Sequence, residues 1–542
     1  MLFQRLLLIS FFRCIFLYTA NWTVEYIRGN PDGYYRVITT INNQSTPGPT
    51  IEVYENEIVD IHLHNKLSTE TVSVHWHGMH QTQKTGWMDG VPYVTMYPVA
   101  PGEVFHYQFQ ARQIGTHWYH SHAGVQYPDG VFGAIIVKDK NDLYTNKIKT
   151  DYTVILNDWY HHDAIELGAE LADNVHPDYF PEYVSGLMNG KGRYNCSTQE
   201  IQSLICVPNH EYQLYNVELN QIYRFRIISA ASGHTFNFSI DNHDLTIIAM
   251  DGIYVEPFVV QRLKLYVAQR YDILVTMNQP IANYWIRATI FDSQVIKGIL
   301  HYANAPDSVD PTSQPSEPKT VLINSMQLSP TVHIQYNESD PFEQWVLNFT
   351  CRNDSYKCEI NGVQFGLPNK PTLLSMYEKD EKHKAQTHII EVPTNTNVRL
   401  ILNNLGSMSH PFHIHGHDFY VLGIGDAYFD HPHPFDNDTK KLRFNNPPKR
   451  DTEQINEYSW MVLQFYSNNP GSWFFHCHID WHLEAGLALV INYKDGSSIE
   501  KPPNDYPIKT NYKQADAAAQ QRKVNVIILL PVVIIILQLC LA

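Results

Sequence analysis

The chain contains 542 residues, a length that exceeds a single hydrophobic core and predicts about three domains. Hydrophobic residues make up 44% of the chain, as is usual for a folded globular protein, whereas charged residues are sparse at 17%. The formal net charge of −16 leaves no basic surface for phosphate backbones, so nucleic acid is excluded as an expected partner.

Residues 1–20 have the pattern of a removable secretory signal. A basic residue, Arg5, precedes an apolar run, and small residues lie just before Asn21. Arg13 interrupts the apolar run without abolishing the pattern. We therefore expect export through the secretory pathway, with a mature chain that begins near residue 21.

Most of the chain consists of short alternating or apolar segments broken by Pro, Gly and Asn. Clear examples are TIEVYENEIVDIHLHN, YRFRIISA, TFNFSI, LKLYVAQRYDILVTM, VRLILNN and WMVLQFYS. Such segments favour β-strands, and long amphipathic helical patterns are nearly absent. The sequence therefore predicts an all-β protein built from sandwich or barrel domains.

Two proline-rich segments and one softer break divide the predicted strands. The segments at 303–319 and 501–512 are interpreted as a linker and a tail, and the softer break at 138–150 follows the strand GAIIVKD. We expect three β domains, then a polar tail and a hydrophobic end, with the bounds 21–145, 146–308, 309–496, 497–523 and 524–542.

Residues 524–542 form an uncharged, largely apolar segment with nothing polar after it. Its length would suit a membrane-spanning helix. The small residues at 515–519, the polar spacer and the absence of a cytosolic flank are more typical of a signal for a glycosylphosphatidylinositol (GPI) anchor. Either device would hold the protein at the extracellular face of the cell surface; a merely apolar terminus is the third alternative.

The cysteine pattern agrees with an oxidising compartment. Two close pairs, Cys196 with Cys206 and Cys351 with Cys358, lie in loop-like sequence and predict two local disulfides. Outside the two terminal segments only Cys477 is left over, and metal ligation is the interpretation we favour for it. Eight Asn-x-Ser/Thr sequons, which accept glycans in secreted proteins, begin at Asn21, Asn43, Asn195, Asn237, Asn337, Asn348, Asn353 and Asn437.

Four histidine pairs share the spacing His-x-His. In an extended strand, residues i and i+2 point to the same side about 6 to 7 Å apart, so each pair can present two imidazoles together. For a single pair, two ordinary surface or core histidines would be the simpler interpretation, but four pairs favour a compact group of copper, zinc, iron or nickel ions. The pairs are His75 with His77, His120 with His122, His413 with His415, and His476 with His478.

Cys477 narrows the choice of metal. Because neighbouring strand residues alternate, its thiolate must point away from the two histidines that flank it. One thiolate with two imidazoles, here those of His482 and His410, is the ligand set of a blue-copper electron-transfer centre. An axial thioether would lie ten residues after the cysteine, where Leu487 cannot ligate, so we expect a relatively high reduction potential. Leu487 can also be an ordinary leucine of the hydrophobic core, and the two interpretations are compatible.

The longest motifs are TPGPTIEV, HWHGMHQTQKTGWMDGVPYVTMYPVAPGEVFHYQF, GTHWYHSHAGVQYPDGVFGAIIV, HPFHIHGHDFYVLG and HCHIDWHLEAGLALV. With these motifs nearly the whole mature chain resembles the multicopper oxidases, and specifically the three-domain laccases. The resemblance implies three cupredoxin-like Greek-key domains and four copper ions: one type 1, one type 2 and a type 3 pair. The implied ligands are Cys477, His410 and His482 for type 1, with Leu487 in the axial place, His75 and His413 for type 2, and His77, His120, His122, His415, His476 and His478 for type 3.

The implied reaction is four one-electron oxidations of a small reducing substrate at the type 1 site, coupled to reduction of O2 to two waters at the three-copper cluster. Asp89 in WMDG and Asp480 in HIDWH resemble the family's acidic residues near the cluster. We expect these carboxylates to relay protons or to hydrogen-bond cluster histidines, the alternative being a purely structural role. Three further histidines, His80, His117 and His417, are expected to support the site or lie at the surface rather than bind another copper ion.

The resemblance implies that electrons enter through His482 or His410, beside loops of the second and third domains. Iron-oxidising relatives use acidic side chains there, whereas the stretch NNLGSMSHPF has Gly406 near the expected carboxylate. The second-domain loop SAASGHTF also lacks the acidic residue that some fungal laccases use to hold a phenol, and Glu182 and Asp241 could compensate from elsewhere. We therefore expect oxidation of diphenols or aromatic amines, with Fe(II) oxidation as the enzymic alternative. A copper-storing or copper-carrying surface protein is the non-catalytic alternative, which the complete ligand set disfavours.

Overall fold

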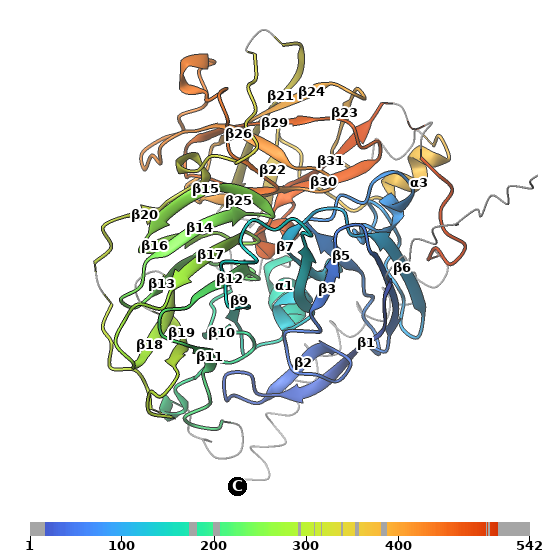
Figure 1. The fold of residues 1–542 in the computed structure, drawn as a ribbon. Helices are drawn as coiled ribbons and strands as arrows, with labels where there is room; N and C mark the ends of the chain where they lie inside the picture. The colour runs from blue at the N-terminus through green and yellow to red at the C-terminus, as the bar shows by residue number, and fades with distance from the viewer. Residues whose placement is uncertain are drawn as a thin grey trace, which may run out of the picture.

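The fold is described from a computed structural model, in which the described residues are 17–172, 181–198, 206–290, 294–307, 309–315, 317–337, 340–352, 357–380, 387–494, 496 and 499–507. Strands make up 45% and helices 8% of the structure, so the predicted all-β class is confirmed. The six sheets form three pairs, which follow one another along the chain and pack around a common centre in Figure 1.

The first pair of sheets contains strands β1 to β8, drawn in blue and teal in Figure 1. Strand alternation explains how it buries its core: Val59, Ile61 and Leu63 of β4 are fully buried. Asp60 and His62, which lie between them in sequence, point to the opposite face of the sheet. The sheet orders are β2-β1-β4-β6 and β3-β8-β7-β5, with bounds β1 Leu17–Gly29, β2 Arg36–Ile41, β3 Ile51–Tyr54, β4 Ile58–Asn65, β5 Val74–His77, β6 Val104–Gln110, β7 Gly115–Ser121 and β8 Phe132–Lys138.

The second pair contains strands β9 to β20, drawn in green in Figure 1. Strand β20 lies beyond residue 308, the expected end of the second domain, and pairs in parallel with β16, so the linker returns to this sheet. The orders are β10-β9-β12-β17-β14-β15 and β11-β19-β18-β13-β16-β20. The bounds are β9 Asp151–Trp159, β10 Ser185–Met188, β11 Gln213–Val217, β12 Ile222–Ser229, β13 Phe236–Ile240, β14 Leu245–Met250, β15 Ile253–Val260, β16 Arg262–Leu265, β17 Arg270–Thr276, β18 Asn283–Ile290, β19 Gln294–Tyr302 and β20 Val321–Leu322.

The third pair contains strands β21 to β31, and its core is continuous with that of the second pair. Cys477 and Leu487 belong to this shared core, whereas the first pair has a core of its own. The orders are β22-β21-β24-β29-β26-β27 and β23-β31-β30-β25-β28. The bounds are β21 Phe342–Arg352, β22 Lys357–Ile360, β23 Ile389–Val392, β24 Asn397–Asn404, β25 His410–Ile414, β26 Phe419–Ile424, β27 Lys449–Arg450, β28 Thr452–Ile455, β29 Trp460–Tyr466, β30 Ser472–Cys477 and β31 Ala488–Tyr493.

The helices that the structure describes are short. The α-helices are α1 (Ala164–Ala172), α3 (Thr372–Tyr377) and α4 (Asp480–Glu484), and the 3₁₀ turns are η1 (Gln83–Met88), η2 (Tyr127–Asp129), η3 (Cys196–Thr198), η4 (Ser325–Gln327) and η6 (Thr439–Lys441). Each strand-like segment quoted from the sequence contains a strand, which confirms those predictions. The two predicted disulfides, Cys196–Cys206 and Cys351–Cys358, are present, and Cys477 is a buried free thiol.

The two ends of the chain are described only in part. The first sixteen residues and the hydrophobic segment 524–542 lie outside the described residues, so the signal and anchor predictions fall there, except that β1 begins at Leu17 and overlaps the predicted signal. Part of the predicted polar tail packs against the first pair of sheets, where the Tyr506 hydroxyl donates to the Thr95 carbonyl over 3.1 Å. Within the described residues, none of the helices has the length and apolarity needed to cross a membrane.

Candidate metal centres

Two antiparallel strand pairs carry the four His-x-His motifs. Strand β5 pairs with β7 so that His75 lies opposite His120, and β25 pairs with β30 so that His413 lies opposite His476. The second member of each motif lies two residues further along and shares the same face. Each strand pair therefore presents four imidazoles on one surface.

The two surfaces face each other across the junction between the first and third pairs of sheets. The rings of His77 and His413 stack with centroids 3.8 Å apart, and those of His75 and His415 are 4.0 Å apart. The histidines form three groups, and within each group the candidate ligand atoms lie within 4.8 Å of one another. The groups are His75 with His77 and His413, His77 with His120 and His478, and His122 with His415 and His476. All eight predicted cluster histidines are thus brought together.

Backbone carbonyls hold several of these rings in one tautomer. A carbonyl only accepts, so a ring nitrogen bonded to it must carry the proton, and the other nitrogen keeps its lone pair. The bonds run from Nδ1 of His75 to Asp89 O (2.8 Å), of His120 to Ser121 O (3.0 Å), of His413 to Asp451 O (2.9 Å) and of His476 to Cys477 O (2.9 Å). The Nε2 atoms of His75, His120 and His413 are buried and have no other hydrogen-bond partner, which fits a bound metal ion.

The same burial keeps the rings neutral, which is the form that binds metal. Desolvation and then the neighbouring histidines hold the pKa of His77 well below its usual value, and desolvation is the main cause of the pKa of about 3 for His476. The pKa is likewise lowered well below the usual value in His120, His122, His413, His415 and His478.

Of the two carboxylates predicted near the cluster, Asp89 contacts it directly. Its side chain is fully buried, and Oδ2 accepts from Nδ1 of His415 over 2.9 Å. Asp480 begins helix α4, and its buried Oδ2 has no hydrogen-bond partner. Burial, and then the charges of Glu484 and Asp158, raise the pKa of Asp480 well above its usual value. The structure therefore supports hydrogen bonding to a cluster histidine for Asp89 alone.

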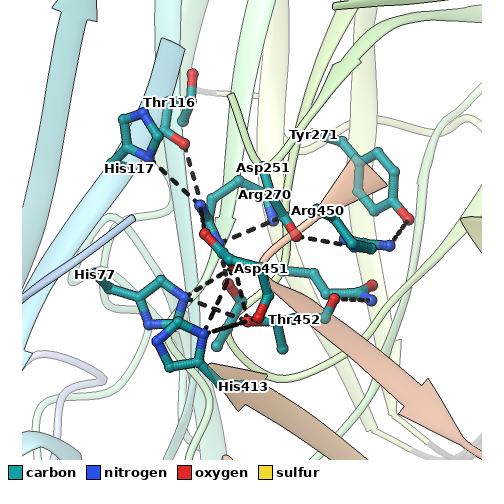
Figure 2. A network of polar contacts seen from close by, with 12 residues as sticks. His77, Thr116, His117, Asp251, Arg270, Tyr271, His413, Arg450, Asp451 and Thr452 are labelled. Atoms are coloured by element: carbon teal, nitrogen blue, oxygen red, sulfur yellow. Dashed lines mark hydrogen bonds and ion pairs between the residues drawn. The ribbon is translucent and has the colours of Figure 1, made fainter. Parts of the chain in front are cut away.

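A third carboxylate at the cluster, Asp451, was missed by the sequence analysis. Its Oδ1 lies 3.2 Å from Nε2 of His77, while its backbone carbonyl accepts from His413. Figure 2 shows Asp451 between these two rings and Arg270, whose guanidinium donates to its oxygens over 2.7 and 2.5 Å. Thr452 adds a hydroxyl 3.1 Å from Nδ1 of His413. No spacing in the segment NNPPKRDTEQI indicated this role.

Arg270, which binds Asp451, belongs to strand β17 of the second pair of sheets. It is fully buried, and it also pairs with Asp251, which accepts from Arg450 over 2.8 Å (Figure 2). Burial raises the pKa of Asp451 to about 6, although the charge of Arg270 opposes that shift. The cluster histidines of the first and third sheet pairs are thus tied to the second pair.

Cys477 occupies a separate site on the other face of β30. Its Sγ lies 3.5 Å from Nδ1 of His410 and 3.7 Å from Nδ1 of His482. Donors at these separations can share one ion with metal–ligand distances of about 2.0–2.3 Å. Burial raises the pKa of the Cys477 thiol, so binding of a metal must displace its proton.

Leu487 is hydrogen-bonded to the backbone of Cys477. Its carbonyl accepts from the Cys477 backbone N–H over 3.0 Å, and its side chain is fully buried in the same core. A neighbour that the sequence analysis did not anticipate is the Cys351–Cys358 disulfide: Sγ of Cys351 lies within 4.8 Å of ring nitrogens of His410 and His482.

A cavity of about 1030 Å³ lies beside His482. Its lining includes the predicted loops of the second and third domains, through residues 233–235 and 407–409. Asp426 and Glu457 supply carboxylates to this lining. Neither of the carboxylates considered from the sequence lines the cavity: Glu182 is exposed, and Asp241 is buried in an ion pair with Arg287 at 2.9 Å. Asp426 and Glu457 lie in loops, where no regular spacing in the sequence marks a residue that lines a cavity. They were therefore not predicted.

Models of the multicopper oxidase family match residues 23–142, 150–305 and 363–497. The chain is 34% identical to Laccase-2 of Agaricus bisporus over 514 residues, which cover 89% of this chain and 91% of that protein. It is 32% identical to an L-ascorbate oxidase of Brassica rapa subsp. pekinensis over 525 residues, which cover 86% and 90% of the two chains.

Solved structures of similar proteins have the same fold. The crystal structure of Fet3p, a multicopper oxidase that functions in iron import, superposes with a TM-score of 0.81 at 26% identity and covers 93% of this chain and 95% of its own. That of the laccase from Botrytis aclada has a TM-score of 0.80 at 29% identity, covering 94% and 92%. Fold, site and relatives agree, and the chain belongs to the multicopper oxidases.

Proposed function

We propose that the protein is a laccase-like oxidase, which removes single electrons from diphenols or aromatic amines and uses them to reduce O2 to water. The observation that carries the proposal is the cavity of about 1030 Å³ beside His482, a residue of the Cys477 site. Ligand pockets typically occupy about 300–1,000 Å³, so a phenol fits this volume readily. The laccases among the relatives support the same choice.

The proposed cofactor is four copper ions. Cys477, His410 and His482 would hold the type 1 ion with Leu487 beside it, and two histidines, His75 and His413, would hold the type 2 ion. The type 3 pair would be held by His77, His120, His122, His415, His476 and His478. Copper bound in this way supplies the one-electron chemistry and the reduction of O2. The neutral rings and orphaned nitrogens described above fit this assignment.

The chain itself provides the connection between the two centres. The backbone of Cys477 continues directly into His476 and His478, whose rings lie among the cluster histidines. Asp89 orients His415, and Asp451 orients His77 and His413, so the ligands keep their positions when charge changes at the cluster. Burial of both centres excludes bulk water from the path.

Oxidation of Fe(II) is the second candidate function. The cavity contains two carboxylates, Asp426 and Glu457, and hard oxygen ligands attract a divalent cation. Glu457 accepts a hydrogen bond from Ser409, the residue before His410, so it lies close to the expected point of electron transfer. The similarity to Fet3p agrees with this alternative.

Steady-state rates on hydroquinone, ascorbate and Fe(II) test the ranking. We expect the highest kcat/KM with hydroquinone; faster turnover of Fe(II) at low micromolar concentration would reverse the order. Glu457→Gln and Asp426→Asn should then lower kcat/KM for Fe(II) by roughly tenfold or more, because each removes a charged contact. Glu182→Gln, which changes an exposed carboxylate outside the cavity, is the matched control. A protein that consumes no O2 with any of these reductants would instead be a copper-binding protein.

We also propose that the protein is exported and tethered at the cell surface. The two disulfides and the eight sequons support an oxidising compartment. Treatment of intact cells with a phosphatidylinositol-specific phospholipase should release oxidase activity into the medium. Activity that stays with the membrane would favour a spanning segment, and activity already free in the medium would contradict tethering.

A further inference from the structure

A second group of metal-ligating side chains lies on the outer face of the first pair of sheets. Strands β4 and β6 are antiparallel, and their register places His62 opposite His106 and Asp60 opposite Gln108. Cross-strand partners have Cβ atoms about 4.5–5.5 Å apart, and residues i and i+2 of one strand share a face. These four side chains therefore lie together on one surface.

The sheet and its core separate this group from the copper centres. Val59, Ile61 and Leu63 of β4 point the other way and are fully buried between the two sheets. Strands β5 and β7, which carry cluster ligands, belong to the opposite sheet of the pair. An ion bound on the outer face would therefore be distinct from those in the cluster.

The ligand atoms of three residues converge on this face. Oδ1 of Asp60 lies 3.1 Å from Nε2 of His106 and 3.5 Å from Nε2 of His62, and all three atoms are within 4.8 Å of one another. The two imidazoles are stacked, with centroids 4.2 Å apart and planes inclined by 2°. Both Nε2 atoms are thus directed at one carboxylate oxygen, an arrangement that a shared cation would stabilise.

Gln108 holds the carboxylate in this orientation. Its Nε2 donates to Oδ2 of Asp60 over 2.7 Å, which turns Oδ1 toward the two imidazoles. A side chain that orients a ligand in this way is a usual feature of metal sites.

We propose that Asp60, His62 and His106 form an additional binding site for one divalent transition-metal ion, Zn²⁺ or Cu²⁺. Two imidazoles and one carboxylate suit these ions, whereas Mg²⁺ and Ca²⁺ prefer oxygen ligands throughout. The side chains of His62 and His106 are 44% and 34% exposed, so the group lies at the surface, whereas the Nε2 atom of His106 is itself buried and has no hydrogen-bond partner. Occupancy of the site does not depend on the oxidase reaction.

Equilibrium dialysis of the copper-loaded, full-length protein against Zn²⁺ tests the site. Zn²⁺ is chosen because it is redox-inactive, and elemental analysis would report zinc and copper together. We expect one zinc per chain at saturation with the copper content unchanged. His62→Ala and His106→Ala should each weaken zinc binding by more than about tenfold, since even removal of an orienting partner costs about 10- to 100-fold in affinity. Gln108→Ala removes such an orienting partner and should weaken zinc binding by about 10- to 100-fold.

His64→Ala is the matched control, because His64 lies on the same strand and face but outside the three-residue group. It should bind zinc as the unaltered protein does. All these variants should keep the blue absorption and the oxidase rate, which shows that they are folded. Absence of saturable zinc, or equal binding in the His62 and His106 variants, would overturn the proposal, as would an equal loss in His64→Ala.

Discussion

The rings of His77 and His413 stack 3.8 Å apart although one lies in the first pair of sheets and the other in the third. Asp451 contacts both rings, and Arg270, at the start of β17 in the second pair, holds Asp451. One buried contact therefore joins all three pairs at the cluster. The positions of His77 and His413, two of the proposed metal ligands, therefore depend on an ion pair between residues that belong to none of the ligand motifs.

Arg270→Gln should destabilise the protein and disturb the cluster. The substitution leaves the carboxylate of Asp451 buried without the guanidinium that pairs with it, whereas Asp251 keeps its ion pair with Arg450. Removing one partner of a buried ion pair costs about 3–5 kcal/mol. We expect a lower free energy of unfolding, and fewer copper ions per chain after purification. Chemical unfolding and elemental analysis measure the two effects.

Arg287→Gln is the control for this substitution. Arg287 forms an ion pair with Asp241 in the second pair of sheets and also donates to the Ser313 carbonyl, so these contacts involve no cluster histidine. Its loss should lower stability without loss of copper. If both variants lost copper equally, Arg270 would have no particular role at the cluster.

Cys477→Ser should abolish the intense blue absorption and the oxidase activity. Serine removes the thiolate on which both depend, while the eight cluster histidines keep their tautomers and contacts. Part of the cluster copper should therefore remain bound. Absorption spectroscopy, O2 consumption and copper analysis distinguish these effects, and retained oxidase activity would refute the proposed electron path.

Leu487→Met should lower the reduction potential of the type 1 site. A thioether at the buried position beside Cys477 would add electron density to the metal and favour its oxidised form. Redox titration of the blue absorption measures the shift. Leu489→Met, at a fully buried position of the same core, controls for the change of side chain and should leave the potential unchanged. An unchanged or higher potential in the Leu487 variant would show that this side chain does not face the metal.

His117→Gln should make stability less sensitive to acid. Burial and the nearby Arg270 lower the pKa of His117 to about 3, from an ordinary value of 6.5. The neutral folded form is fully favoured above pH 6.5, and stability falls as pH drops toward 3, because only the unfolded chain gains the proton. In that window His117 contributes a slope of about 1.4 kcal/mol per pH unit.

Urea unfolding between pH 7 and pH 4 measures this slope in the two proteins. The curve of the glutamine variant should be shallower, and the exposed His333→Gln controls for the loss of an imidazole. Parallel curves for the original protein and His117→Gln would contradict the assignment.

Several features of the site could be predicted because they are local. The His-x-His spacing places two imidazoles on one face of a strand wherever that strand lies, and the pleat directs Cys477 away from His476. The disulfide Cys196–Cys206 joins residues ten apart in sequence, and such a close pair in loop-like sequence is informative without a fold. The first two inferences rest on backbone geometry that every strand shares, and the third rests on the short separation of the two cysteines in sequence.

Other features could not be predicted because they depend on contacts between distant strands. Asp451 and Arg270 meet only when the second and third pairs of sheets pack together, and neither residue belongs to a periodic pattern. Glu457 lines the cavity beside His482 from a loop, and His62 lies opposite His106 only because of the register of β4 and β6.

The all-β class, the two disulfides and the residues able to bind metal could be predicted from the amino-acid sequence, because strand alternation and ligand chemistry act over a few residues. In contrast, the packing of the folded chain establishes which histidines face one another, which carboxylates contact them and which residues line the cavity beside His482. Those relationships arise from sheet packing and strand register, which depend on the summed burial of whole sheets rather than on any short motif.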